Sequence, residues 1–314
     1  MKFTKSFLTY EQQADLLLAR GLQGDRTTLI SHLQSVSYFR LSGYWHLFRK
    51  PDPARRGTKL DDFAPDATVE RVWDRYVFDR RVRLLVMDAL ERIEVDARTR
   101  LAYLHSEKHG PFGYADDPAT LPGLTVPART KFLDTFRNYL AESDEDFVVH
   151  FRTKYGSDHN DLPIWVACEL MTFGNLFTFF RGCKPDIQKE LAKRYGISDA
   201  VCQSWLKTLN TIRNICAHHA RLWNRVLGVK PMIPNKDPKW KYEVDTASGK
   251  QLIPIPNDRV FSILTICRHC LDVITPGHSW TERFQKILAE HPDIPRAGLG
   301  LIPDWDKHPL WSNP

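Results

Sequence analysis

One short segment of the chain combines a titratable base with permanent cations. Arg213, Asn214 and His218 lie within six residues of one another, and His219 follows directly. An imidazole titrates near neutral pH and can take the proton from a ribose 2′-hydroxyl, while a guanidinium binds the nonbridging phosphate oxygens that gain charge in the transition state. RNA carries its own nucleophile, so this chemistry needs neither a metal ion nor a cofactor. The residue types therefore favour RNA phosphodiester chemistry, since a DNA strand lacks the 2′-hydroxyl.

The surrounding sequence is basic. The range 201–236 contains six basic residues and no Asp or Glu. The rest of the chain has equal numbers of basic and acidic residues, so the net charge of +6 is concentrated in this range. We expect it to form a surface that faces phosphates. The candidate contacts to an RNA backbone are Lys207, Arg221, Asn224 and Arg225.

Helical spacing predicts how this segment is presented. Ser198 or Asp199 can cap a helix that runs to about Arg225. On a helical wheel of residues 205–226, the apolar stripe consists of Trp205, Leu209, Ile212, Cys216 and Trp223, and the opposite face holds Asn214, His218, Arg221 and Arg225. Arg213 lies on the shoulder, from which its long side chain can swing toward His218. His219 points to the core side, so we predict that it supports the catalytic groups by packing.

Spacing alone is a weak signal, because Arg100 and His105 repeat the same pattern inside a helix rich in ion pairs. A solvated basic helix is therefore a competing interpretation. Glu91 and Glu94 lie on the long predicted helix, from which they can reach the site if that helix packs beside it. We expect them instead to pair with neighbouring arginines.

A zinc site is disfavoured. Cys267 and Cys270 form one CxxC, but the only histidine shortly after it is His278, and a structural site needs two further ligands. Adjacent histidines on a helix diverge by about 100° and the chain has no HExxH pattern, so a zinc hydrolase built on His218 and His219 is a poor fit. Six cysteines in 314 residues are too few for a disulfide scaffold and fit a reducing compartment.

The elements that must position the site are helical. Helical periods run over residues 10–21, from about 27, over 68–105 with acid-before-base pairs four residues apart, and over 129–155, 185–195, 258–274 and 280–290. Residues 51–65 read as a polar loop, and residues 236–242 as either a hairpin or a plain excursion. Tyr38, Tyr44 and Trp45 read as a core cluster rather than a platform for RNA bases.

No segment reads as a membrane span. The best candidate, Leu162–Phe180, carries Pro163 and Glu169, so we expect a buried helix that Gly174 bends or interrupts. Met1–Tyr10 lacks the continuous apolar stretch of a secretory signal, and we expect a cytoplasmic protein.

The segment Trp205–Arg225, with its core Arg213-Asn-Ile-Cys-Ala-His-His219, closely resembles the signature of bacterial abortive-infection proteins of the AbiD/AbiF type, a branch of the HEPN superfamily. Further segments resemble the same family in the same order: Leu8–Leu17, Tyr38–Trp45, Tyr76–Arg83 with Glu91–Glu94, and Leu162–Val166 with Phe173-Gly174. The resemblance covers residues 8 to 290.

This resemblance implies an all-α protein, with a compact HEPN-type helical bundle, additional N- and C-terminal helices and irregular loops. The implied division is a single unit over 1–290, with N-terminal helices in 8–50, a HEPN-like core over about 68–226 and C-terminal helices in 258–290. An irregular tail, 291–314, follows.

The resemblance also implies a function. The implied function is that of a metal-independent endoribonuclease of bacterial phage defence, in which Arg213 stabilises the transferring phosphate, His218 is the general base or acid and Asn214 orients one of these two side chains. Cleavage leaves a 2′,3′-cyclic phosphate. A homodimer joined through the motif face brings two copies of the site together, and some relatives resemble toxins restrained by a partner or a small structured RNA. The alternative is a noncatalytic RNA-binding protein of the defence or toxin–antitoxin kind that holds such an RNA.

Overall fold

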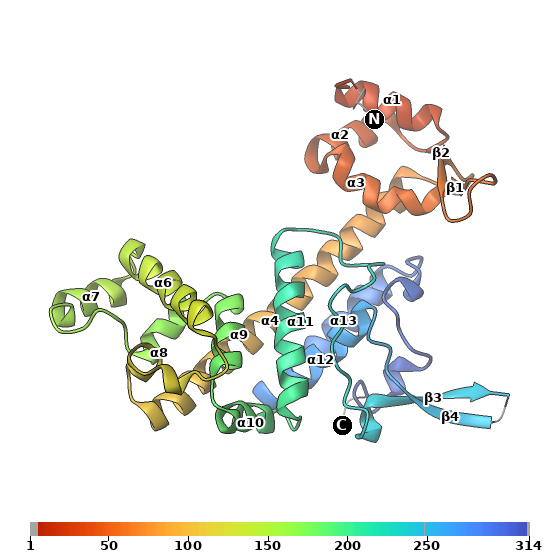
Figure 1. The fold of residues 1–314 in the computed structure, drawn as a ribbon. Coiled ribbons are helices and arrows are strands. Elements are labelled where there is room, and N and C mark those ends of the chain that lie inside the picture. The colour runs from red at the N-terminus through yellow and green to blue at the C-terminus, as the bar shows by residue number, and fades with distance from the viewer. Residues whose placement is uncertain (1–5, 248, 313–314) are drawn as a thin grey trace. The chain divides into compact units, whose positions relative to one another are not determined.

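The computed structural model describes residues 6–247 and 249–312, which form a mostly helical protein (Figure 1). These described residues contain 13 α-helices and two small two-stranded antiparallel sheets. The predicted all-α fold class is confirmed. Residues 1–5 of the segment searched for a secretory signal, and residues 313–314 of the predicted irregular tail, lie outside the described residues.

The chain divides into two compact units. The N-terminal unit comprises Met1–Arg83 and Phe284–Pro295, and the central unit comprises Leu84–Arg283 and Arg296–Pro314. Helices α4 (Val69–His109) and α13 (Trp280–Glu290) contribute residues to both. The predicted division into a single helical HEPN-like unit over 1–290 and a tail stays a prediction.

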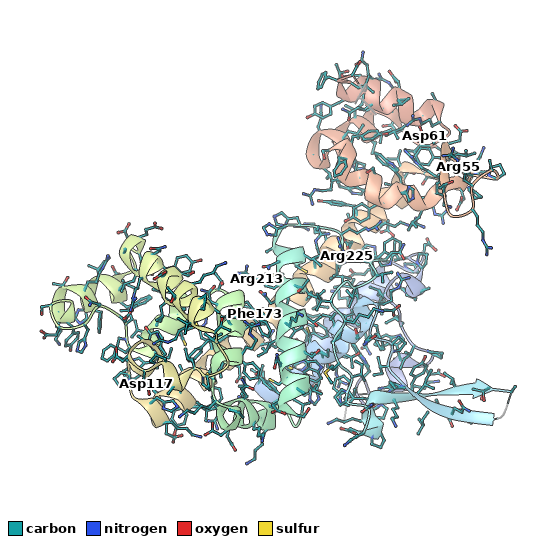
Figure 2. The ribbon with its side chains drawn as sticks, in the orientation of Figure 1. Arg55, Asp61, Asp117, Phe173, Arg213 and Arg225 are labelled. Atoms are coloured by element: carbon teal, nitrogen blue, oxygen red, sulfur yellow. The ribbon has the colours of Figure 1, made fainter. Side chains whose placement is uncertain are left out.

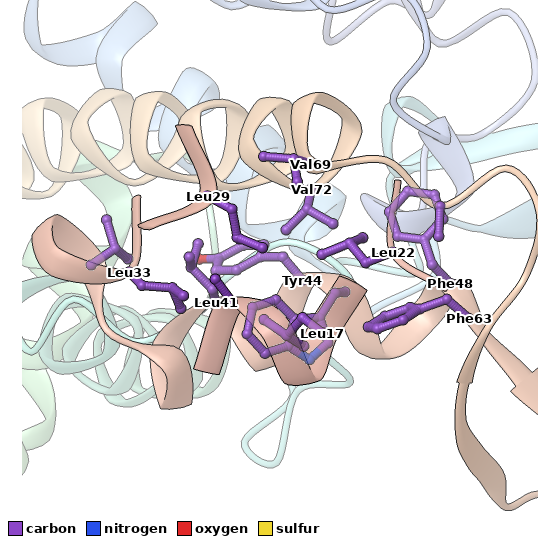
Figure 3. Packing of buried hydrophobic residues seen from close by; sticks show 14 residues of the cluster. Leu17, Leu22, Leu29, Leu33, Leu41, Tyr44, Phe48, Phe63, Val69 and Val72 are labelled. Atoms are coloured by element: carbon purple, nitrogen blue, oxygen red, sulfur yellow. The ribbon is translucent and has the colours of Figure 1, made fainter. Parts of the chain in front are cut away.

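The N-terminal unit is built around one apolar cluster. Its elements are α1 (Tyr10–Ala19), α2 (Arg26–Val36), α3 (Tyr38–Trp45), a 3-10 turn (His46–Phe48), β1 (Arg49–Pro51), β2 (Lys59–Phe63) and the start of α4. Figure 3 shows the cluster, in which side chains from the three helices and the hairpin meet Val69 and Val72 of α4. Tyr44 and Trp45 are buried and Tyr38 packs against the cluster, so the prediction of an aromatic core is confirmed.

The hairpin of β1 and β2 was not predicted. Pro51, Pro53 and Gly57 indicate a polar loop, yet Arg49 pairs with Phe63 and Pro51 with Lys59. The loop interpretation is wrong because proline at the end of a short edge strand still allows pairing on its other side.

Helix α4 forms where acid-before-base pairs predicted a long helix. Ion pairs join Asp79 to Arg83, Asp88 to Arg92 and Glu94 to Arg98. The same spacing predicts a pair between Asp96 and Arg100, but Asp96 pairs instead with Arg194 of helix α10 (Pro185–Arg194). Local pairs therefore combine with tertiary pairs, among them Arg81 with Glu290 and Lys108 with Asp186, to secure this helix.

The central unit holds the remaining elements. They are α5 (Gly113–Asp116), α6 (Val126–Glu142), α7 (Asp146–Tyr155), α8 (Ile164–Ala167), α9 (Phe173–Gly182), α10 (Pro185–Arg194), α11 (Asp199–Ala217), β3 (Lys241–Thr246), β4 (Gly249–Pro254) and α12 (Val260–Ile274), with short 3-10 turns at Pro118–Thr120, Cys168–Leu170, Pro238–Trp240, Arg296–Gly298 and Trp305–Lys307. Neither interpretation of residues 236–242 fits fully, because this range forms the 3-10 turn Pro238–Trp240 and only the first two residues of β3, whereas the hairpin itself lies further along the chain.

The apolar segment Leu162–Phe180 is divided rather than continuous. Helix α8 and a 3-10 turn end before Met171, and Thr172 caps α9 by accepting the N–H of Asn175. The interruption therefore precedes Gly174, which lies in the first turn of α9. Among the described residues, we find no helix with the length and apolarity needed to cross a bilayer.

Candidate functional site

Helix α11 presents the first half of the candidate segment. Ser198 caps it, since its hydroxyl accepts the N–H of Val201 at 3.3 Å. The predicted apolar stripe is buried: Trp205, Leu209, Ile212 and Cys216 are each at most 4% exposed. This stripe packs inward, with the indole of Trp205 against the ring of His269 from α12, and leaves Lys207 and Asn214 on the opposite side of α11 exposed.

The helix ends at Ala217, so the prediction that it continues to about Arg225 is wrong. His219 has a left-handed backbone with φ of 57°. Its N–H donates to the carbonyl of Cys216 at 3.0 Å, and the N–H of Ala220 donates to the carbonyl of Ile215 at 2.9 Å. These two bonds close a Schellman turn, which usually places glycine at the left-handed position. Because histidine stands there instead, the sequence shows no helix stop.

This turn changes which residues share a face. His218 is the C-terminal cap of α11 and is exposed, as is Asn214 one turn earlier. Arg213 is half-buried, so all three predicted catalytic side chains reach solvent. His219 is exposed, and its predicted orientation toward the core is wrong. Figure 2 labels Arg213 on α11 and Arg225 in the segment beyond its end.

A carboxylate from α4 lies within electrostatic reach of the arginine of the motif. The electrostatic field of Arg213 acts on Glu94, whose side chain is 13% exposed. Burial raises the pKa of the Glu94 carboxyl above its ordinary value, and the guanidinium groups of Arg98 and Arg213 oppose that rise. The helical wheel of residues 205–226 shows a basic face without a carboxylate. Glu94 belongs to α4, which is distant in sequence, so only tertiary packing places it near Arg213.

Arg98 connects this carboxylate to the start of α9. Its Nη2 donates to Glu94 Oε1 at 2.8 Å and to the carbonyl of Met171 at 2.8 Å. Gly174, in the first turn of α9, lies against the side chain of Asn210 on α11. The beginning of α9, whose first residue Phe173 is labelled in Figure 2, therefore helps to hold the middle of α11 near Glu94.

The segment after α11 is anchored rather than loose. Trp223 is 1% exposed although α11 ends before it, and its indole lies against Gly298. The N–H of Asn224 donates to the carbonyl of Gly298 at 2.9 Å, and Asn224 Oδ1 accepts from Arg259 at 3.3 Å. These contacts fix the position of the chain that follows the turn.

The predicted RNA contacts are dispersed. Lys207 is exposed on α11, whereas Arg221 and Arg225 are half-buried beyond its end. Arg225 Nε donates to the carbonyl of Arg221 at 2.8 Å, so the two arginines are joined by a local turn instead of a helix face. Their roles, and that of Asn224, stay predictions.

Sequence reasoning missed Arg98 and Arg259 as residues that hold the site. The pairing of Glu94 with Arg98 was visible as an acid-before-base spacing, but its connection to Met171 was not. Nothing in the local pattern indicates Arg259, which lies at the start of α12 far along the chain.

A comparison with protein families finds one described as Abi-like protein, whose model matches residues 31–224. This range covers more than half of the chain and includes α4, α9, α11 and the turn that carries His218. No curated protein and no solved structure matches the chain.

Proposed function

The chain belongs to the Abi-like protein family, and on this premise we propose that it is a metal-independent endoribonuclease that acts in abortive-infection defence of bacteria against phage. The observation that carries the proposal is the exposed imidazole of His218 at the end of α11, with solvent-accessible Arg213 in the preceding turn. The resemblance of this motif to HEPN nucleases supports the same activity. The enzyme would act in the cytoplasm.

The reaction follows from the residue types. His218 accepts the proton of a ribose 2′-hydroxyl, and the oxygen attacks the adjacent phosphorus. The bond from phosphorus to the 5′-oxygen breaks, and that oxygen takes up a proton and leaves. Arg213 stabilises the charge on the nonbridging oxygens, and Asn214 orients one of the reacting groups. The products are a 2′,3′-cyclic phosphate and a 5′-hydroxyl.

Two chains would complete the site. One exposed imidazole can remove a proton, but the leaving oxygen needs a donor on the opposite side of the phosphorus. A homodimer that pairs the motif faces supplies it as the partner's His218. Lys207, Arg221, Asn224 and Arg225 would then contact the backbone of the bound RNA.

Glu94 has a positioning role in this proposal. A flexible guanidinium loses rotamer freedom when it holds a phosphate, and a carboxylate beside it limits the orientations that it samples. The hydrogen bonds of Arg98 to Glu94 and to the carbonyl of Met171 hold that carboxylate in place. His219 supports the site by setting the turn that ends α11.

Purified protein and end-labelled RNA test the proposal. We expect cleavage that persists in EDTA and is lost in His218→Ala, while His150→Ala, which removes an exposed histidine from α7, retains it. Arg213→Lys should also lose most activity, because an ammonium cannot reproduce the planar fork of guanidinium donors. Cleavage that stops in chelator, or that is unchanged in His218→Ala, refutes the proposal.

One observation favours the alternative of a noncatalytic RNA-binding protein. Glu94 lies within electrostatic reach of Arg213, and an arginine that interacts with a carboxylate is less available to a transition state. In that case the chain holds a small structured RNA, with an inhibitory or guiding role, and does not cut it. RNA binding without cleavage under every tested condition would support this function.

A further inference from the structure

The hairpin of β1 and β2 carries a cluster of exposed cations at its tip. We define the basic tip as Lys50, Arg55, Arg56 and Lys59, all of which are exposed. Within residues 6–247 and 249–312, none of these four side chains takes part in an ion pair or a side-chain hydrogen bond. Four solvated cations therefore lie within ten residues of sequence and have no structural use in the fold.

Of the three acidic residues of the hairpin, Asp52 and Asp61 are already engaged and Asp62 is exposed. Asp61 lies near the base, where it pairs with both Arg20 and Arg49 at 2.7 Å. Asp62 follows it on β2 and is exposed, so the four cations of the basic tip outnumber this one unengaged carboxylate. The tip contains one acid, Asp52, which is committed to the turn itself.

The turn is ordered by its own hydrogen bonds. Asp52 Oδ1 accepts the N–H of Ala54 at 2.9 Å, and Asp52 Oδ2 accepts the hydroxyl of Thr58 at 3.2 Å. The N–H of Asp52 donates to the carbonyl of Thr58 at 3.0 Å, and Gly57 has a left-handed backbone with φ of 86°. Because the turn is formed before any ligand arrives, binding at the tip would cost little backbone entropy.

We propose that the basic tip is a second RNA-binding site, which holds the phosphate backbone of single-stranded RNA. Arginine side chains bind phosphates through paired donors, and lysines add charge without sequence preference. The range 50–59 contains no aromatic or large aliphatic residue, so it lacks the groups that would insert into a lipid surface. The choice of RNA as the polyanion rests on the proposed function.

Binding of RNA by an uncleaving chain tests this site. The full chain with His218→Ala is mixed with a fluorescent single-stranded RNA of about 20 nucleotides, and anisotropy is followed as salt increases. The test variant adds Lys50→Gln, Arg55→Gln, Arg56→Gln and Lys59→Gln. The control variant instead adds Lys131→Gln, Lys154→Gln, Lys189→Gln and Lys193→Gln, which remove the same charge from exposed positions of the central unit.

We expect the test variant to bind at least about tenfold more weakly at moderate salt, and its salt slope to fall by about 3 for four lost phosphate contacts. The control variant should stay within about twofold of the parent. A second variant with only Arg55→Gln and Arg56→Gln should show about half the loss of slope, which separates a local effect from misfolding. Equal losses in test and control variants overturn the proposal.

Two further outcomes are decisive. If the hairpin variants lose binding to vesicles containing anionic phospholipid and keep RNA binding, the tip is a membrane site and the proposal is wrong. If the wild-type chain cuts no RNA but its RNA binding depends on the hairpin, the proposed nuclease function fails and this inference stands. If RNA is cut and binding does not depend on the hairpin, only this inference fails.

Discussion

Acid should destabilise the central unit through one buried histidine. His105 of α4 is 0% exposed and packs against Phe179 of α9, with ring centroids 5.2 Å apart. Neither of its ring nitrogens has a hydrogen-bond partner among the described residues. Burial, together with the nearby His109 and Lys184, lowers the pKa of His105 from 6.5 to about 4.

The direction and size of the effect follow from that shift. Because the folded pKa lies below the unfolded one, the unfolded chain takes up the proton first as the pH falls from 6.5 toward 4. Stability is therefore complete above pH 6.5 and is lost over this window. Between pH values of about 7.5 and about 5, the contribution of His105 amounts to a loss of about 2 kcal/mol in the free energy of unfolding.

Urea unfolding at these two pH values, followed by circular dichroism, measures the effect. Other histidines also titrate. The effect of His105 is therefore the change in the free energy of unfolding between the two pH values in the wild type, minus the same change in His105→Phe. We expect this quantity to be about 2 kcal/mol, and we expect His150→Phe to leave the pH dependence unchanged. If His105→Phe shows the same pH dependence as the wild type, the burial argument is refuted.

Three other substitutions have expected outcomes. Asp79→Ala removes the buried carboxylate that pairs with Arg83 and should lower the free energy of unfolding by about 3 to 5 kcal/mol in urea titrations; a loss below about 1 kcal/mol contradicts this. Glu94→Gln should slow single-turnover RNA cleavage by about tenfold to a hundredfold while the RNA dissociation constant changes little, and unaltered cleavage would exclude its positioning role. Gly298→Ala places a Cβ atom into the indole of Trp223 and should cost about 1 to 3 kcal/mol of stability, whereas an unchanged unfolding midpoint would show that the indole moves freely.

The helices could be predicted where their signals are local. The span of α13 coincides with its prediction, and α4 follows from ion pairs spaced four residues apart. The end of α11 could not be predicted in this way. The left-handed residue after α11 is His219 rather than glycine, so the sequence shows no helix stop. A helix extended past this turn would place Arg221 and Arg225 on one face, but that face does not exist.

In the candidate site, too, the features with a local signal could be predicted and those that depend on tertiary packing could not. Exposure of His218 and burial of Trp205, Leu209, Ile212 and Cys216 agree with the apolar period of α11. The approach of Glu94 to Arg213 depends on packing between helices that are distant in sequence, and no local pattern contains that information. The hairpin of β1 and β2 was hidden for a different reason, because prolines and charged residues at its tip resemble an unpaired loop.

The 2′-hydroxyl at the cut linkage provides the most direct test of the central claim. Once a cleavage position is mapped in a labelled RNA, the same RNA is made with a single 2′-deoxyribose on the 5′ side of that linkage. We predict that cleavage there disappears while other positions are still cut, and that the products of the unmodified RNA end in a 2′,3′-cyclic phosphate. Continued cleavage at the 2′-deoxy linkage would contradict the account.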